Sequence, residues 1–225
     1  MVKVLLNLQK QILKFFNMKR IDIIKKKKFE FIKIAQPPHF IGSWNIENNE
    51  LCKEIVNYFE ENKLLQKVGV TQNGINPEVK KTIDIRVTPN ELKKIELKCL
   101  HNYINELYKC FIDYQNQWPI LKKTINEVDI GSFNIQKYSK GDHFAKVHSE
   151  RSDVKASQRI FAWMTYLNDV DDGGRTYFDH YKIKIKPEIG KTLIWPAEWT
   201  HSHSGEILNS GVKHIVTGWM NLPYS

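Results

Sequence analysis

The chain has 225 residues, of which 41% are hydrophobic and 12% are aromatic. This is enough for one domain with a substantial core, and the composition is typical of a globular protein, not of a disordered one. The net charge of +9 is unevenly distributed, because residues 1–34 hold ten Lys/Arg and two Asp/Glu, whereas residues 35–225 hold 24 and 23. The nearly neutral body argues against a nucleic-acid-binding domain with a basic footprint over its whole surface.

The three cysteines, Cys52, Cys99 and Cys110, form an odd and sparse set without CxxC spacing. Such a set argues against a disulfide framework or a zinc ribbon, and it fits a reducing compartment. We therefore expect a cytoplasmic protein.

Residues 1–36 are predicted to form a basic leader that precedes the domain of residues 37–225. Apolar residues recur near the helical period between positions 5 and 16, and residues 25–28 are all lysine. Three interpretations stay open: an amphipathic helix that contacts an anionic membrane surface, an electrostatic tether to nucleic acid, and a poorly ordered extension. The leader has neither the length of apolar sequence that a transmembrane helix needs nor the pattern of a secretory signal.

Two helices are predicted within residues 48–115, as a helical support for the domain. The first spans residues 48–65, with Asn48 or Asn49 as its N-cap. The second spans residues 88–114 and opens on Thr88-Pro-Asn-Glu91, the pattern of a capping box with proline at the first helical position. The segment between them, residues 68–86, contains an Asn-Gly turn signal and is predicted to be a loop.

From residue 128 onward the pattern changes to short runs rich in Val, Ile, Thr and aromatic residues, separated by Gly, Asp, Asn and Pro. The predicted strands are residues 130–138, 159–167, 182–186, 191–195, 200–204 and 214–221. Helices followed by many short strands indicate an α+β fold. We expect a double-stranded β-helix, or jelly roll, over residues 128–221 with the N-terminal helices supporting it.

His148, Glu150 and His203 are the candidate metal ligands. Two imidazoles and one carboxylate, which leave coordination positions open, form the facial triad of non-haem Fe(II) oxygenases. His148 and Glu150 are two residues apart, so on a strand both side chains would leave the same face. The third ligand would come from a distant strand, and both His203 and His201 are candidates for it.

Four segments, residues 138–150, 166–168, 173–178 and 203–213, together resemble the prolyl 4-hydroxylase-like Fe(II)/2-oxoglutarate-dependent dioxygenases, especially small members from bacteria and phages. The resemblance covers roughly residues 40–221 and implies the jelly roll, with His148, Glu150 and His203 holding iron. The family usually has Asp where this chain has Glu150, and the extra methylene moves the carboxylate oxygens outward by about one bond. The resemblance also implies Fe(II), 2-oxoglutarate and O2 as cofactors, with ascorbate as reductant.

The same resemblance assigns three residues, Lys213, Tyr166 and Tyr138, to the cosubstrate. Lys213 would pair with the distal carboxylate of 2-oxoglutarate, since a buried ammonium needs a partner. Tyr166 would bind the same carboxylate, and Tyr138 would point at the iron and the inner end of the cosubstrate. Trp219 lies six residues after Lys213 on the same strand face, and this spacing predicts that it lines the pocket.

The implied activity is hydroxylation of a C–H bond, with release of succinate and CO2, on a peptidyl proline or another protein residue. The same chemistry on a free amino acid, a metabolite or a nucleotide is an alternative. A non-catalytic jelly-roll binding module and a basic adaptor acting through the leader are two further hypotheses. Residues 68–86, which include Lys81, Asp84 and Arg86, are a candidate substrate lid.

Overall fold

The computed structural model describes residues 38–71, 74–125 and 127–223, so the predicted leader of residues 1–36 lies outside the described residues. The described residues from His39 onward form one compact unit. In chain order the elements are β1 (Gly42–Asn45), α2 (Asn49–Glu61), η1 (Lys63–Leu65), β2 (Lys67–Val68), β3 (Ile83–Val87), α3 (Pro89–Leu92), η2 (Ile95–Leu97), α4 (Lys98–Gln117), α5 (Ile120–Thr124), β4 (Asp129–Ile130), β5 (Phe133–Ser139), β6 (Phe144–His148), η3 (Val154–Ala156), β7 (Arg159–Tyr166), β8 (Thr176–Phe178), β9 (Ile183–Ile185), β10 (Lys191–Pro196), η4 (Trp199–His201), β11 (His203–Gly205) and β12 (Val212–Asn221), where η marks a 3-10 helix.

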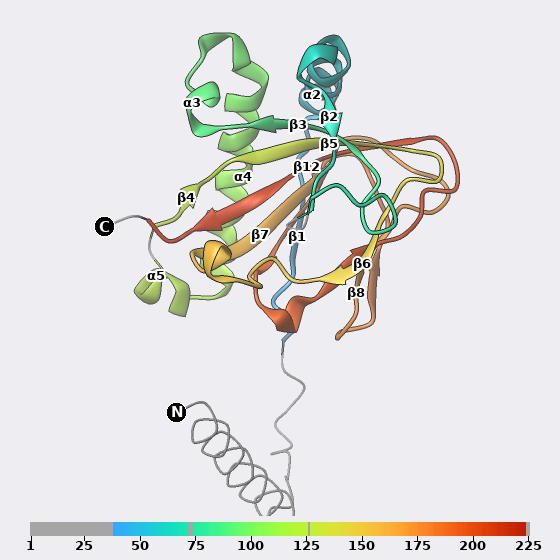
Figure 1. Cartoon of the computed structure of the whole chain (residues 1–225). Coiled ribbons are helices and arrows are strands. Elements are labelled where there is room, and N and C mark those ends of the chain that lie inside the picture. The colour runs from blue at the N-terminus through green and yellow to red at the C-terminus, as the bar shows by residue number, and fades with distance from the viewer. Residues whose placement is uncertain (1–37, 72–73, 126, 224–225) are drawn as a thin grey trace, which may run out of the picture. The chain divides into compact units, whose positions relative to one another are not determined.

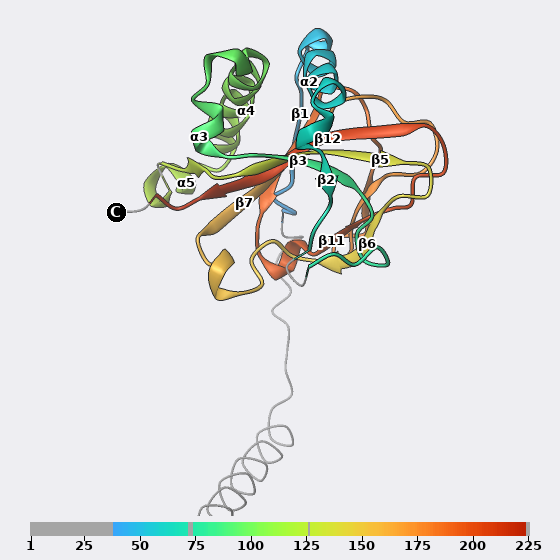
Figure 2. The same cartoon turned by 45° about the horizontal axis from the view of Figure 1, so that its top comes forward.

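The strands form two antiparallel sheets. The larger has the order β1-β10-β7-β12-β5-β3-β2, with β4 also paired to β12, and the smaller has the order β6-β11-β8-β9. Figures 1 and 2 show α2 and α4 on one side of the larger sheet and the strands of the smaller sheet on the other. The predicted α+β fold with a jelly-roll core and N-terminal helices is thus confirmed.

The helices form much as their sequences predict, with one correction. Helix α2 begins after Asn48, whose side chain accepts a hydrogen bond from the Leu51 amide, and α3 begins with the expected capping box at Thr88. The prediction of one continuous second helix was wrong, because the chain breaks into α3, η2 and α4. Lys94 adopts an extended conformation, and the His101 ring contacts the Leu92 carbonyl that an unbroken helix would have bonded to a backbone amide. None of the described helices is long and apolar enough to cross a membrane.

Three central strands of the larger sheet are buried on both faces. On β7, Phe161 and Trp163 pack into the core beneath the helices, whereas Met164 and Tyr166 pack into the core between the sheets. Strands β5 and β12 alternate in the same way. Because successive side chains of a strand point to opposite faces, every second residue of these strands is directed at the space between the sheets.

The prediction of a loop over residues 68–86 was wrong at its two ends, which lie in strands β2 and β3. Strand β3 occupies Ile83–Val87 and pairs with β5, and its residues Ile85 and Val87 are buried in the helix-side core. Strand β2 pairs with β3 as a short edge. The alternation of apolar residues in β3 was present in the sequence but covers only five residues.

The predicted strand over residues 200–204 begins instead with the 3-10 helix η4 and becomes strand β11 only at His203.

Leu107 and Tyr108 provide a matched test of this packing. Leu107 is fully buried in the core beneath α4, whereas its neighbour Tyr108 is 58% exposed. We expect Leu107→Ala to lower the free energy of unfolding by about 2–5 kcal/mol, since it removes buried methyl groups and leaves a cavity. Tyr108→Ala should change it by no more than about 0.5 kcal/mol. Chemical denaturation followed by circular dichroism measures both, and equal losses would contradict the assignment of the core.

Candidate functional site

His148 and His203 lie side by side on neighbouring strands of the smaller sheet. His148 is the last residue of β6, His203 is the first of β11, and the two are direct antiparallel partners. Their ring centroids are 4.5 Å apart. Glu150 lies two residues past the end of β6, and its Oε1 atom is 3.3 Å from His203 Nε2 and 3.6 Å from His148 Nε2. One ligand atom from each of the three predicted residues therefore lies within 4.8 Å of the others.

Both imidazoles are oriented by hydrogen bonds from their far nitrogen. His148 Nδ1 lies 2.8 Å from the Lys146 carbonyl, and His203 Nδ1 lies 3.0 Å from the His201 carbonyl. A carbonyl can only accept, so each Nδ1 must carry the proton, and a neutral ring then presents the lone pair of Nε2. The ring of His148 is also stacked against Phe144 at 3.9 Å. These contacts direct both Nε2 lone pairs at Glu150 Oε1.

The three converging atoms fit a divalent cation. Burial alone would raise the pKa of Glu150, but hydrogen bonds from His148 and His203, when their Nε2 atoms carry protons, hold that pKa well below its usual range, so the carboxylate is ionised. A divalent cation would replace these protons and bind the Nε2 lone pairs. Two imidazole lone pairs and one carboxylate oxygen, with no other described protein ligand in the cluster, are the donor set of the 2-His-1-carboxylate centre that binds Fe(II) and leaves positions open. The set would also bind other divalent transition metals.

His201, the alternative ligand, points elsewhere. Its Nε2 atom is 2.8 Å from the His39 carbonyl, and its Nδ1 atom is 2.9 Å from the Thr200 hydroxyl. Both ring nitrogens therefore have protein partners, and the geometry favours His203 over His201.

Lys213 is a buried ammonium without an acidic partner. Its side chain is 3% exposed, its Nζ atom donates to the Gly174 carbonyl at 2.9 Å, and it lies 4.1 Å from the centroid of the Tyr138 ring. Gly174 has a φ of +66°, and a Cβ there would lie 3.3 Å from Lys213 Cδ, so glycine permits this close approach. No carboxylate of the described residues lies within ion-pair distance of Lys213. Burial lowers the pKa of Lys213 to about 8, although the charge of Glu206, which is paired with Arg175, acts in the opposite direction. An acidic ligand in contact with Lys213 would raise this pKa again.

Tyr166 and Tyr138, the two predicted tyrosines, project into the same space between the sheets as Lys213. The Tyr166 hydroxyl is 2.6 Å from the Thr176 hydroxyl, and either oxygen can be the donor. Tyr166 can therefore accept from Thr176 and donate to a ligand. Burial raises the pKa of both tyrosines, so both stay protonated.

The hydrogen bond of Tyr138 has a fixed direction. Asp84 is buried and paired with Lys80 at 2.6 Å, and its Oδ2 atom accepts from Gln136 Nε2 at 3.1 Å. Because an ionised carboxylate only accepts, the Gln136 amide must turn its oxygen towards Tyr138, whose hydroxyl donates to it at 2.9 Å. The free side of the Tyr138 hydroxyl is then an acceptor. Sequence reasoning missed Lys80 and Gln136, and it placed Asp84 in a lid, although this residue is buried in β3.

Trp219 contacts Glu150, one of the three candidate metal ligands. Its indole Nε1 donates to Glu150 Oε2 at 2.7 Å. Arg159, which the sequence did not single out, lies over the Trp219 ring at 3.6 Å and donates to the Glu150 carbonyl at 2.9 Å. The only signal in the sequence for Arg159 is a charged residue at the start of an apolar strand, which is too weak to identify it.

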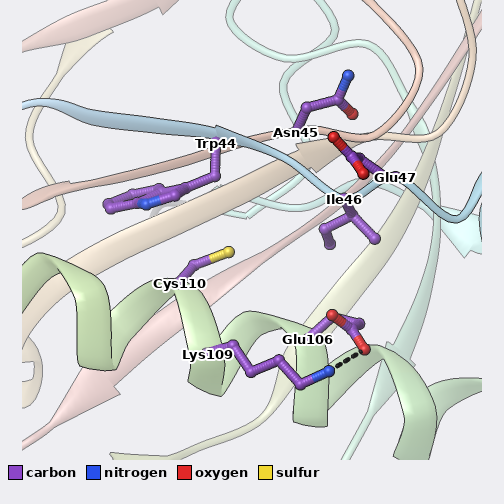
Figure 3. A pocket seen from close by; sticks show the side chains of 7 residues that line it. All are labelled: Trp44, Asn45, Ile46, Glu47, Glu106, Lys109 and Cys110. Atoms are coloured by element: carbon purple, nitrogen blue, oxygen red, sulfur yellow. Dashed lines mark hydrogen bonds and ion pairs between the residues drawn. The ribbon is translucent and has the colours of Figure 1, made fainter.

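A separate hollow of about 300 Å³ lies between β1 and α4 (Figure 3). The residues that line it are Trp44, Asn45, Ile46, Glu47, Glu106, Lys109 and Cys110. Two of its charged side chains are already paired, since Lys109 bonds to Glu106 at 2.7 Å. It shares no residue with the candidate site.

Comparison with known proteins finds similarity to one family. Residues 133–221 match the family model described as the 2OG-Fe(II) oxygenase superfamily. "Probable prolyl 4-hydroxylase 9" of Arabidopsis thaliana is 28% identical over 115 residues, which are 40% of this chain and 40% of that protein. "Prolyl 4-hydroxylase 13" of the same plant is 26% identical over 115 residues, or 40% and 42% of the two chains. The match thus spans less than half the length of either curated relative.

Solved structures share the fold. The viral collagen prolyl hydroxylase of Paramecium Bursaria Chlorella virus-1, solved with 2OG, superimposes with a TM-score of 0.59 at 18% identity, over 82% of this chain and 97% of that one. A Pseudomonas putida prolyl-4-hydroxylase superimposes with a TM-score of 0.63 at 13% identity, over 83% and 94%. At these identities the likeness establishes the double-stranded β-helix and its helices.

Substitution of His203 and of its neighbour His201 gives a direct test of the metal site. We expect His203→Ala to weaken binding of Co(II) or Mn(II) by more than about 100-fold, because it removes a ligand and not only an outer partner. His201→Gln should stay within about tenfold of the unsubstituted protein, since glutamine can still donate to the His39 carbonyl. Calorimetric titration of both variants measures this, and the opposite order of affinities would make His201 the ligand.

Proposed function

We propose that this protein is an Fe(II)- and 2-oxoglutarate-dependent dioxygenase that hydroxylates a C–H bond and releases succinate and CO2. The match of residues 133–221 to the model of the 2OG-Fe(II) oxygenase superfamily supports this proposal. The observation that carries the proposal is a pair of sites in one fold. A cluster of two imidazoles and a carboxylate fits a metal, and a buried ammonium without an acidic partner among the described residues fits a dicarboxylate.

In this proposal His148, His203 and Oε1 of Glu150 hold Fe(II). Iron and 2-oxoglutarate, when bound, supply the oxygen-activating chemistry, while the protein supplies orientation and electrostatics. The Nδ1 hydrogen bonds of both histidines fix the rings, so that the metal site is organised before the metal binds. Ascorbate would serve as reductant.

Lys213 would bind the distal carboxylate of 2-oxoglutarate, and Tyr166 would donate a second hydrogen bond to it. Burial makes such a charge-assisted contact strong and excludes water from the pocket. Tyr138 packs against Lys213 and offers an acceptor, so we expect it to contact a donor, such as a bound water, more readily than a carboxylate.

A peptidyl proline or another protein residue is the proposed substrate. Support comes from the curated relatives, which are named prolyl 4-hydroxylases, and from the structural neighbours, which are named prolyl hydroxylases. Val68, Val70 and Ile75 are exposed apolar side chains at or near β2, and this segment stays the candidate contact region for a substrate. A free amino acid, metabolite or nucleotide is the alternative. The cytoplasmic location and any role of the leader stay predictions.

Succinate release tests the proposed reaction. Purified full-length protein with Fe(II), ascorbate, oxygen and 2-oxoglutarate should form succinate slowly without added substrate and faster with a proline-containing peptide that fits the site. The doubly substituted protein His148→Ala/His203→Ala should form none, because it lacks two metal ligands. Absence of both succinate and 2-oxoglutarate binding in the unsubstituted protein would favour a non-catalytic binding module instead.

The buried Lys213 predicts how cosubstrate affinity depends on pH. Its pKa of about 8 means that the ammonium is largely charged at pH 7 and largely neutral at pH 9. Since the dicarboxylate binds the charged form, we expect affinity for 2-oxoglutarate to fall about tenfold between these pH values. Lys213→Arg should remove this dependence, because arginine stays protonated. Calorimetry with Mn(II)-loaded protein measures the dissociation constants, and equal slopes in the two proteins would contradict the role of Lys213.

A further inference from the structure

We propose that Trp219 is a positioning residue that holds the Glu150 carboxylate in the orientation needed to bind the metal. The inference rests on the proposed metal site and adds to it a partner that acts through Glu150. It differs from the expectation that Trp219 only walls the cosubstrate pocket.

The two oxygens of Glu150 have different partners. Oε1 is the atom that faces His148 and His203, at 3.6 Å and 3.3 Å from their Nε2 atoms. Oε2 accepts the indole N–H of Trp219 at 2.7 Å. A hydrogen bond to an ionised carboxylate is roughly twice as strong as one between neutral groups. It leaves Oε1 as the oxygen that is free to coordinate.

Arg159 helps to hold Trp219 in place beside Glu150. The Arg159 guanidinium lies over its ring at 3.6 Å from the centroid. The same guanidinium donates to the Glu150 backbone carbonyl at 2.9 Å, and its Nη1 atom is 3.9 Å from Oε2. Arg159 therefore ties the backbone of Glu150 to the ring that bonds its side chain. The carboxylate, the indole and the guanidinium form one packed unit.

The length of Glu150 explains why such a partner is needed. Glutamate has one more rotatable bond than aspartate, so it samples more orientations and loses more conformational entropy when it is fixed on a metal. A hydrogen bond from a rigid, partly buried ring to Oε2 removes this freedom before the metal binds. An aspartate at this position would place its oxygens about one bond nearer the backbone and away from the indole N–H.

A double-mutant cycle on metal affinity tests the proposal in the full-length protein. We would measure the dissociation constant of Co(II) for the unsubstituted protein, Trp219→Phe, Glu150→Asp and the doubly substituted protein. Loss of an outer-shell partner costs about 10- to 100-fold in metal affinity, so we expect Trp219→Phe to weaken Co(II) binding at least tenfold. In the Glu150→Asp background the same substitution should change the affinity less than about twofold, because the bond it removes is absent there.

Trp195→Phe is the matched control. Trp195 is buried and lies edge-on to His203 with ring centroids 5.1 Å apart, but its indole N–H has no hydrogen-bond partner among the described residues. Both substitutions thus shorten a tryptophan that touches the cluster, and only one removes a hydrogen bond to a ligand. Trp195→Phe should change the dissociation constant less than about threefold, and circular dichroism should show that all variants fold.

Each outcome separates this inference from the proposed function. Co(II) binding that Trp219→Phe weakens no more than Trp195→Phe would overturn the role of Trp219 and leave the metal site intact. The same loss on Trp219→Phe in both backgrounds would also overturn it, since the effect would not pass through Glu150. Failure of the unsubstituted protein to bind Co(II) would overturn both the inference and the proposed function. If Glu150→Asp alone abolishes binding, the comparison of Trp219→Phe with Trp195→Phe decides.

Discussion

Burial of the larger sheet on both faces is the constraint from which the site follows. Strands β5, β7 and β12 need apolar side chains towards α2 and α4, and the pleat then sends the intervening residues into the space between the sheets. Tyr138, Tyr166, Lys213 and Trp219 all occupy these intervening positions. The packing of the helices thus determines which residues can meet a ligand, even though no helix contributes to the metal cluster.

The positive charge of Lys213 is poorly stabilised when no ligand is bound. A buried ammonium without an acidic partner costs free energy, and its pKa falls because burial disfavours the charged form. The unfolded chain binds this proton more tightly than the folded chain, so the contribution of Lys213 to stability improves as pH rises from about 8 towards the usual lysine pKa of about 10.4. A bound dicarboxylate would reverse this penalty. Stability and ligand affinity are therefore coupled through one side chain.

The sequence predicted the elements whose signals are local and strong. The Asn48 cap, the Thr88 capping box and the apolar runs of β7 and β12 each depend on a few neighbouring residues, and all are present in the structure. Strand β3 was missed because it is short and follows a turn signal. The break before α4 was missed because it depends on a contact from His101, nine residues away, which periodicity does not reveal.

The features of the candidate site were likewise predicted from the sequence only in part. The spacing of His148 and Glu150 identifies two members of the cluster, but only the register of β6 with β11 shows that His203, and not His201, completes it. The direction of the Tyr138 hydrogen bond depends on a buried ion pair from another strand. The orientation of Glu150 likewise depends on a ring 69 residues away. Residue type and spacing therefore indicate which atoms can bind a ligand. Which oxygen, nitrogen or proton faces it is decided by hydrogen bonds that only the folded chain displays. For both histidines the partner lies two residues away, and for Tyr138 and Glu150 the hydrogen bonds involve distant residues.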